Sequence, residues 1–103
     1  MGPLHIEVER DGFSTTVRCA GEIDTWTVDR LSQALGEAVG SDAAAVVLDL
    51  TGVRFMDSTG LHAVIVGATS AESIGVRFSV LPSAPVERLL EMAGMRDIVQ
   101  GRM

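Results

Sequence analysis

The sequence predicts an α/β fold: a mixed, mainly parallel sheet of four to five strands with an antiparallel N-terminal edge hairpin, covered by three to four helices. Strand-like and helix-like patterns alternate along most of the chain, and one short apolar run is typical of a buried strand. With 103 residues, 47% of them hydrophobic, the chain is long enough for one core. We therefore expect residues 1–103 to form a single domain.

The first strands are expected to form the edge hairpin. Residues 4–9 alternate apolar with polar side chains, which indicates a half-buried strand with His5 on its solvated side. Asp11-Gly12 can turn the chain, and Ser14–Ala20 is again strand-like. The turn Gly21–Asp24 ends this second strand.

The middle of the chain predicts a helix, a buried strand and a second helix. Apolar residues at helical spacing follow Thr25 and Thr27, either of which can cap the first helix. The run Ala45–Leu48 predicts a strand buried on both faces, and the polar residues after it predict a short loop. The second helix is expected to end near Ser73 before Gly75, with a core stripe of Leu61, Val64, Ile65 and Ala68.

The last elements are expected to complete the sheet and its cover. Residues 76–81 form an apolar run that predicts another strand. Ser83 can cap a third helix, which Gly94 would stop. The segment Asp97–Val99 is expected to add an edge strand.

The segment before the second helix carries the candidate site. Asp57 is the expected N-cap, which places Ser58 and Thr59 in the first turn, near unpaired backbone N–H groups. A strand that leads through a short segment into a helix is where α/β proteins present a binding or reactive group. At about 100° per residue, one surface strip that a partner could contact consists of Ser58, His62, Val66 and Thr69.

Composition and motifs exclude several classes of function. The net charge of −6 argues against a protein that binds duplex nucleic acid directly. The sequence shows neither a membrane-spanning apolar run nor a signal-like start, so we expect a cytoplasmic protein without membrane contact. The single Cys19 fits an inert core thiol, with no zinc site or internal disulfide. No phosphate-binding glycine motif occurs, and we expect no cofactor or metal.

The sequence offers one candidate for catalysis, a serine–histidine hydrolase. Ser58 and His62 are four residues apart on one predicted helix and could approach each other. The sequence around Ser58 is not the G-x-S-x-G turn of a nucleophilic serine, and no pair of oxyanion donors is evident. We therefore expect a protein that is not an enzyme.

The stretch Phe55–Leu61, preceded by Asp49–Val53, resembles the signature of the STAS domain in the branch of stand-alone bacterial anti-sigma factor antagonists. The resemblance implies that Ser58 is the phosphorylated switch residue and that Asp24 lies near it. Taken by itself, Asp24 can equally be a turn or capping carboxylate. His62 departs from the family, which commonly has a small residue at this position.

The resemblance also implies a mechanism. The unmodified protein would bind an anti-sigma factor that is also a serine kinase and so free a sigma factor; phosphorylation of Ser58 would abolish binding, and a metal-dependent serine phosphatase would restore it. The expected partner-binding residues are Asp24, Thr25, Asp57, Ser58, Thr59, His62 and Val66. The protein itself is expected to be a monomer or a weak homodimer.

Two further hypotheses remain open. The chain could be a STAS subunit that docks on a lipid or anion transport complex and is never phosphorylated, so that Ser58 belongs to a static contact surface. It could also be a sensor of a small molecule or nucleotide, with the ligand at the start of the second helix.

Overall fold

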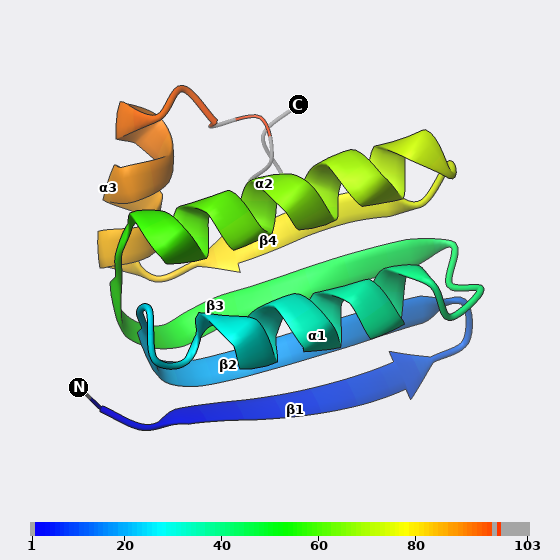
Figure 1. Cartoon of the computed structure of the whole chain (residues 1–103). Coiled ribbons are helices and arrows are strands. Elements are labelled where there is room, and N and C mark those ends of the chain that lie inside the picture. The colour runs from blue at the N-terminus through cyan, green and yellow to red at the C-terminus, as the bar shows by residue number, and fades with distance from the viewer. Residues whose placement is uncertain (1, 96, 98–103) are drawn as a thin grey trace.

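The protein folds into a mixed sheet covered by helices (Figure 1). The computed structural model describes residues 2–95 and 97. The elements are, in order, β1 (Leu4–Asp11), β2 (Ser14–Ile23), α1 (Val28–Val39), β3 (Ala45–Met56), α2 (Ser58–Ser73), β4 (Arg77–Pro82) and α3 (Ala84–Met92).

The described part of the chain forms one sheet with the strand order β1-β2-β3-β4. β1 and β2 pair antiparallel, whereas β2 with β3 and β3 with β4 pair parallel. The expected mainly parallel sheet with an antiparallel N-terminal hairpin is therefore confirmed. The sheet has four strands and the described residues form three helices, which lies within the predicted numbers.

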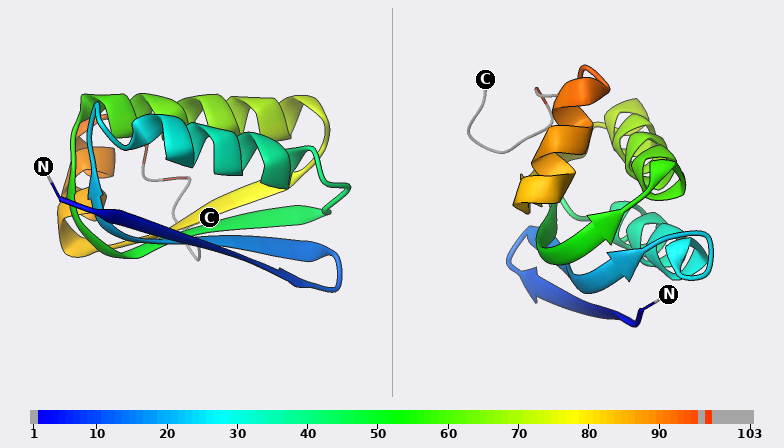
Figure 2. Two further views of the ribbon diagram at one scale, coloured as in Figure 1. Left: turned by 60° about the horizontal axis from the view of Figure 1, so that its bottom comes forward. Right: turned by 90° about the vertical axis from the view of Figure 1, so that its left-hand side faces the viewer.

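Two helices lie side by side on one face of the sheet. α1 and α2 contact each other along their lengths, and α3 crosses the end of the sheet against β3 and β4 (Figure 2). Because β2 and β3 are parallel neighbours, their carboxyl ends lie at the same edge and lead into α1 and α2, respectively. The two strand-to-helix turns therefore lie beside each other.

The core lies between the sheet and its helices. Its fully buried side chains are Val17, Ile23, Leu31, Val46, Leu48, Leu50, Val64, Val80, Val86 and Leu90. Cys19 belongs to this core, as predicted, and burial, assisted by the charge of Asp49, raises its pKa to about 12. Its thiol is therefore protonated and unreactive at neutral pH. His5 is exposed on β1, also as predicted.

The predicted loop before α2 is wrong in extent, because β3 continues to Met56. Its polar stretch stays paired with β2, which itself continues to Ile23. At two register shifts β3 carries one residue more than β2, and Gly52 lies so close to β2 that a Cβ there would be 3.0 Å from that of Ala20. The hydrogen bonds to β2 thus keep this stretch of β3 in a strand, although its polar composition is typical of a loop. The outer face of β3 is also only half-buried at Val47, so its predicted burial on both faces is wrong.

The predicted core stripe of α2 is confirmed at Val64, is only partly buried at Leu61 and Ala68, and is wrong at Ile65. Its buried residues are Gly60, Ala63, Val64, Gly67 and Ala71, while Ile65 is exposed and Leu61 and Ala68 are half-buried. Small residues face the core because the helix packs closely: a Cβ on Gly67 would lie 3.2 Å from Cδ1 of Leu35. The face of α2 that is buried is the one whose small side chains allow the helix to pack closely on the core, and not the one with the largest apolar side chains.

The predicted cap of α3 and the predicted helix ends at Gly75 and Gly94 are confirmed, whereas the prediction of an edge strand is wrong at Asp97. The hydroxyl of Ser83 accepts a hydrogen bond of 3.4 Å from the Val86 amide and caps α3. Gly75 and Gly94 follow α2 and α3 with φ of +77° and +75°, the left-handed conformation that ends helices. In the predicted edge strand, Ile98 and Val99 lie outside the described residues, and Asp97 does not belong to a strand.

Candidate functional site

The two turns at the carboxyl ends of β2 and β3 are joined directly. The amide of Asp57 donates a hydrogen bond of 3.2 Å to the carbonyl of Ile23, the last residue of β2. The turn 24–27 starts at the next residue of the chain. The segment before α1 and the start of α2 therefore form one continuous surface.

Asp57 caps α2 as the sequence predicts. Its Oδ1 atom accepts hydrogen bonds from the backbone N–H groups of Thr59 (2.9 Å) and Gly60 (3.3 Å) and from the hydroxyl of Thr59. Burial raises the pKa of the Asp57 carboxyl, but the hydrogen bonds from Thr59 and Gly60 together lower it by a larger amount. The pKa of Asp57 therefore lies below its usual value. The cap is thus fully charged at neutral pH.

Ser58 is the first residue of α2 and is exposed. Because the Asp57 carboxylate turns inward to the N–H groups, the Ser58 hydroxyl remains on the outside of the helix start. The partial positive charge of a helix N-terminus stabilises an added anionic group at this place. The geometry therefore suits a hydroxyl that is phosphorylated without loss of the fold.

Asp24 organises the neighbouring turn. Its Oδ1 atom accepts hydrogen bonds from the backbone N–H groups of Trp26 (2.9 Å) and Thr27 (3.2 Å). The Thr27 hydroxyl accepts from the Asp24 amide (3.0 Å) and donates to the carbonyl of Glu22 (2.9 Å). Thr27 is the N-cap residue, as one alternative predicted, but its hydroxyl bonds to the turn instead of to the helix N–H groups.

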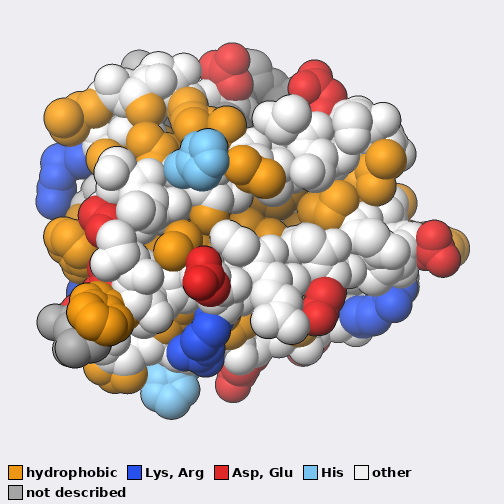
Figure 3. Space-filling model, viewed as in Figure 1, with side chains coloured by type: hydrophobic (Ala, Val, Ile, Leu, Met, Phe, Trp, Pro, Cys, Tyr) orange, Lys and Arg blue, Asp and Glu red, His pale blue; other side chains and the backbone are white. Residues whose placement is uncertain are grey.

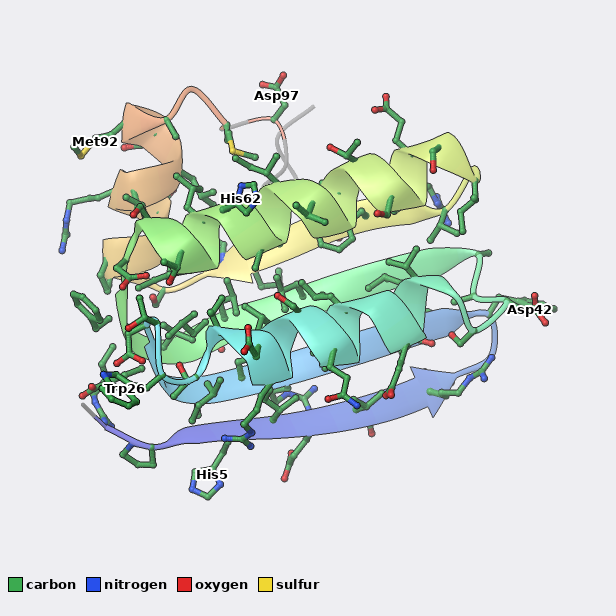
Figure 4. The ribbon with its side chains drawn as sticks, in the orientation of Figure 1. His5, Trp26, Asp42, His62, Met92 and Asp97 are labelled. Atoms are coloured by element: carbon green, nitrogen blue, oxygen red, sulfur yellow. The ribbon has the colours of Figure 1, made fainter. Side chains whose placement is uncertain are left out.

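The Asp24 turn exposes the aromatic side chain of Trp26, which was not among the predicted site residues. Trp26 is 74% exposed, and Phe55, two residues before Asp57, is 50% exposed. Figure 4 shows Trp26 at the edge where β2 and β3 end. Its signal in the sequence is a tryptophan placed between turn residues, outside the apolar spacing of α1. Tryptophan is enriched among the residues that carry most of the binding energy of protein interfaces.

Ser58 lies at a groove between the first halves of α1 and α2. The groove has a volume of about 500 Å³ and is lined by Val28, Asp29, Ser32, Ser58, Thr59, His62, Ala63 and Val66. It brings together four of the predicted site residues, Ser58, Thr59, His62 and Val66. Asp24, Thr25 and Asp57 are not part of its lining and belong to the adjoining turns. Thr69 lines a different hollow beside Phe78.

The surface around Ser58 is mostly apolar with charge at its margin. Figure 3 shows hydrophobic side chains between the two helices and around the histidine on α2, which Figure 4 labels as His62. Val66 is 50% exposed in this area. Asp29 supplies the negative charge on the α1 side of the groove. Such an arrangement suits a protein partner with an apolar surface and a basic margin.

The described residues also bear on metal sites and membrane spans. Within residues 2–95 and 97, no group of three His, Cys, Asp or Glu side chains lies close enough together to hold a metal ion. No helix in the described part of the chain combines the length and the apolar content that spanning a bilayer requires.

The chain belongs to the STAS domain family, whose match covers residues 5–103. The resemblance at Phe55–Leu61 is thereby confirmed at the level of the family. The mixed four-stranded sheet with its helices is thus a STAS fold.

Several similar proteins are named anti-sigma factor antagonists. The chain is 36% identical over 102 residues to the anti-sigma-B factor antagonist of Listeria monocytogenes, covering 94% of this chain and 87% of that protein. It is 44% identical over 70 residues to the anti-sigma-F factor antagonist RsfB of Mycobacterium tuberculosis, covering 66% of this chain and 55% of RsfB. A solved anti-sigma factor antagonist from Mycobacterium paratuberculosis superposes with a TM-score of 0.86 at 27% identity, covering 95% and 84% of the two chains.

Proposed function

We propose that this protein is an anti-sigma factor antagonist that is switched off by phosphorylation of Ser58. The observation that carries the proposal is the exposed Ser58 hydroxyl at the first residue of a helix whose cap is already supplied by Asp57. The names of its relatives support the same function. In this proposal the chain acts by binding in the cytoplasm and not by catalysis.

The unmodified surface around Ser58 binds the anti-sigma factor. An apolar groove beside an exposed tryptophan offers area for contact, and the partner then releases its sigma factor. The proposed contact residues are Asp24, Thr25, Asp57, Ser58, Thr59, His62 and Val66, to which the structure adds Trp26.

Phosphorylation changes the charge of this surface but not the fold. A phosphate adds a charge of about −1.5 to −2 at neutral pH. The start of α2 tolerates that charge. A docked partner would bury the same phosphate beside the carboxylates of Asp29 and Asp57, where like charges and lost hydration oppose binding. Release of the partner follows.

Two enzymes complete the proposed cycle. The anti-sigma factor is proposed to be the serine kinase that modifies Ser58, because a bound partner already has access to that hydroxyl. A metal-dependent serine phosphatase would remove the phosphate and restore binding. The exposure of Ser58 makes the site accessible to both enzymes in turn.

A binding titration tests the proposal. The purified anti-sigma factor kinase of the same organism is titrated with the wild-type protein, Ser58→Ala and Ser58→Glu. We expect wild-type and Ser58→Ala to bind with similar affinity and Ser58→Glu to bind at least tenfold more weakly. The matched control is Thr69→Glu, which adds the same charge to an exposed position of α2 outside the groove. Equal affinity of Ser58→Glu and wild-type would contradict the electrostatic switch.

A further inference from the structure

The groove at Ser58 continues along the whole length of α1 and α2. A second hollow of about 300 Å³ is lined by Ser32, Leu35, Gly36, Val39, Gly40, Ala63, Val66, Gly67, Ser70, Ser73 and Ile74. It shares Ser32, Ala63 and Val66 with the groove at Ser58. The two hollows thus form one α1–α2 groove, which spans about 24 Å because an α-helix rises about 1.5 Å per residue.

The far half of the α1–α2 groove is uncharged. Its lining consists of small and apolar residues with serines, and the charged Asp29 and the titratable His62 lie only at the Ser58 end. Val66 and Ile74 are 50% and 61% exposed along it. A Cβ added at Gly36 would meet no atom within 4 Å, so the groove is open at this position. Small residues between two helices allow a third helix to approach closely.

We propose that an amphipathic helix of the anti-sigma factor kinase lies in the α1–α2 groove, with a basic side chain next to Asp29 and apolar side chains from Val66 to Ile74. The inference rests on the proposed function and extends its contact from the Ser58 end to the far ends of both helices. A helix of about sixteen residues has the length of this groove.

Continuity and charge favour this occupant. The groove begins at the hydroxyl that the kinase must reach, and shared lining residues connect that end with the apolar half. Its single carboxylate, that of Asp29, lies at the Ser58 end, where it complements a basic side chain of the partner. The serines along the far half can hydrogen-bond a polypeptide, which a lipid chain cannot do.

A second copy of the chain fits the groove less well. The helix with a highly exposed apolar residue is α3, where Met92 is 85% exposed. α3 has only nine residues, and its Val86 and Leu90 are fully buried in the core of its own chain. It therefore cannot fill the groove without leaving that core.

The proposal separates two parts of one contact. The Ser58 end is sensitive to charge, so its contribution to affinity depends on phosphorylation and on salt. The far half is apolar, and its contribution depends on neither. A substitution that fills the far half should weaken binding at every salt concentration.

The test uses the purified anti-sigma factor kinase of the same organism that phosphorylates Ser58. Gly36→Trp places an indole in the open part of the groove and is compared with Gln33→Trp, which places the same side chain on the exposed face of α1 outside the groove lining. Gly36→Ala controls for the backbone. We expect Gly36→Trp to bind at least tenfold more weakly, both at low and at high salt, and both controls to stay within twofold of wild-type.

A second measurement does not depend on the variants. Amide signals of the ¹⁵N-labelled wild-type protein are followed while unlabelled kinase is added. We expect shifts at Ser32, Gly36, Ser70 and Ile74 as well as at Ser58. Shifts confined to the Ser58 end, or normal binding by a folded Gly36→Trp, would overturn the inference.

The outcomes distinguish the inference from the function on which it rests. If Ser58→Glu weakens binding to the kinase and Gly36→Trp does not, the switch is retained and the groove contact is overturned. The absence of any binding kinase overturns both. The purified protein could instead bind a fatty acid, or form a dimer in the absence of kinase. If Gly36→Trp abolished that fatty-acid binding or that dimer, the groove would have another occupant, and the inference would be overturned.

Discussion

Two aspartate turns of the same design lie side by side and present different groups. In each turn one carboxylate oxygen accepts hydrogen bonds from the N–H groups two and three residues further on: Trp26 and Thr27 for Asp24, Thr59 and Gly60 for Asp57. After Asp57 the helix starts at once, so Ser58 lies on its first turn. After Asp24 the helix starts only at Val28, and the intervening turn exposes Trp26.

The difference shows how one local motif supports two kinds of contact. The Asp57 turn places the hydroxyl that we propose to be phosphorylated in the positive field of a helix start. The Asp24 turn places an indole at the margin of the same surface, where it adds apolar contact area. The hydrogen bond from the Asp57 amide to the Ile23 carbonyl keeps the hydroxyl and the indole in a fixed relation.

Gly60→Ala should break the comparison most strongly, because Gly60 of the Asp57 turn packs directly on core side chains. The new Cβ would lie 2.5 Å from Cγ of Met56 and 2.7 Å from Cγ2 of Ile23. We expect the free energy of unfolding to fall by about 2 kcal/mol, the usual cost of overpacking. Urea denaturation followed by circular dichroism measures it. Gly36→Ala, at an open helical position, should instead raise the stability by up to about 1 kcal/mol, and equal effects of the two variants would contradict the packing argument.

Trp26→Ala should remove the group that the Asp24 turn presents. An exposed anchor of an interface contributes about 2 kcal/mol to binding, so affinity for the anti-sigma factor should fall more than tenfold. The free energy of unfolding should change by less than about 0.5 kcal/mol, as is usual for exposed positions. The matched control is Phe13→Ala, which removes an aromatic ring that is 81% exposed in the β1–β2 turn. A titration in which both variants bind equally would reject Trp26 as an anchor.

Asp57→Ala and Asp24→Ala compare the two caps themselves. Loss of an N-cap carboxylate costs about 1 kcal/mol, which we expect for Asp57→Ala. Asp24→Ala should cost less, because the Asp24 carbonyl still accepts two hydrogen bonds, from Thr27 (3.1 Å) and Val28 (2.9 Å), whereas the Asp57 carbonyl keeps one, from Leu61 (3.1 Å). Thermal and urea unfolding of the two variants give the ranking, and a larger loss for Asp24→Ala would show that the carbonyl does not support the turn.

The smallest expected effect is on the pH dependence of stability. The pKa of Asp57 is lowered by folding, so the native protein holds fewer protons than the unfolded chain at moderately acid pH. Its contribution to stability is complete above the unfolded pKa of about 3.9 and is lost as the pH falls toward the lower native value. Asp57→Asn should therefore lose less stability than wild-type on acidification through this window.

Asp49 does not disturb that measurement. Burial raises the pKa of Asp49, but hydrogen bonds from Thr51 and Arg18 together lower it by a larger amount. Asp49 is present both in the wild-type protein and in Asp57→Asn, so its effect is the same in both. Unfolding curves measured at several pH values for wild-type and Asp57→Asn therefore isolate the Asp57 carboxyl. Parallel curves for the two proteins would contradict a cap that is stabilised by its charge.

The features that the sequence predicted best are those set by short-range rules. Asp57 as cap, Ser58 and Thr59 in the first turn, and glycines after α2 and α3 depend on hydrogen bonds and backbone angles within a few residues. The alternation of strands and helices likewise indicated the sheet and its hairpin. The STAS resemblance rested on the same stretch of the chain.

The features that the sequence did not reveal depend on how elements meet. The extension of β3 to Met56 requires its bulged pairing with β2, which a polar segment does not announce. The buried face of α2 is made of glycine and alanine, whose weak apolar signal was outweighed by Leu61 and Ile65. The α1–α2 groove arises only when the two helices are placed side by side.

Mapping of phosphate on the native protein tests the switch most directly. The protein is purified from its own cells before and after stress, its intact mass is measured, and its peptides are sequenced by mass spectrometry. We predict a single phosphate on Ser58 whose occupancy changes with the conditions. A protein that is never phosphorylated would contradict the switch and favour a STAS subunit that docks through a static surface; phosphate on Thr59 in place of Ser58 would contradict the assignment of the residue.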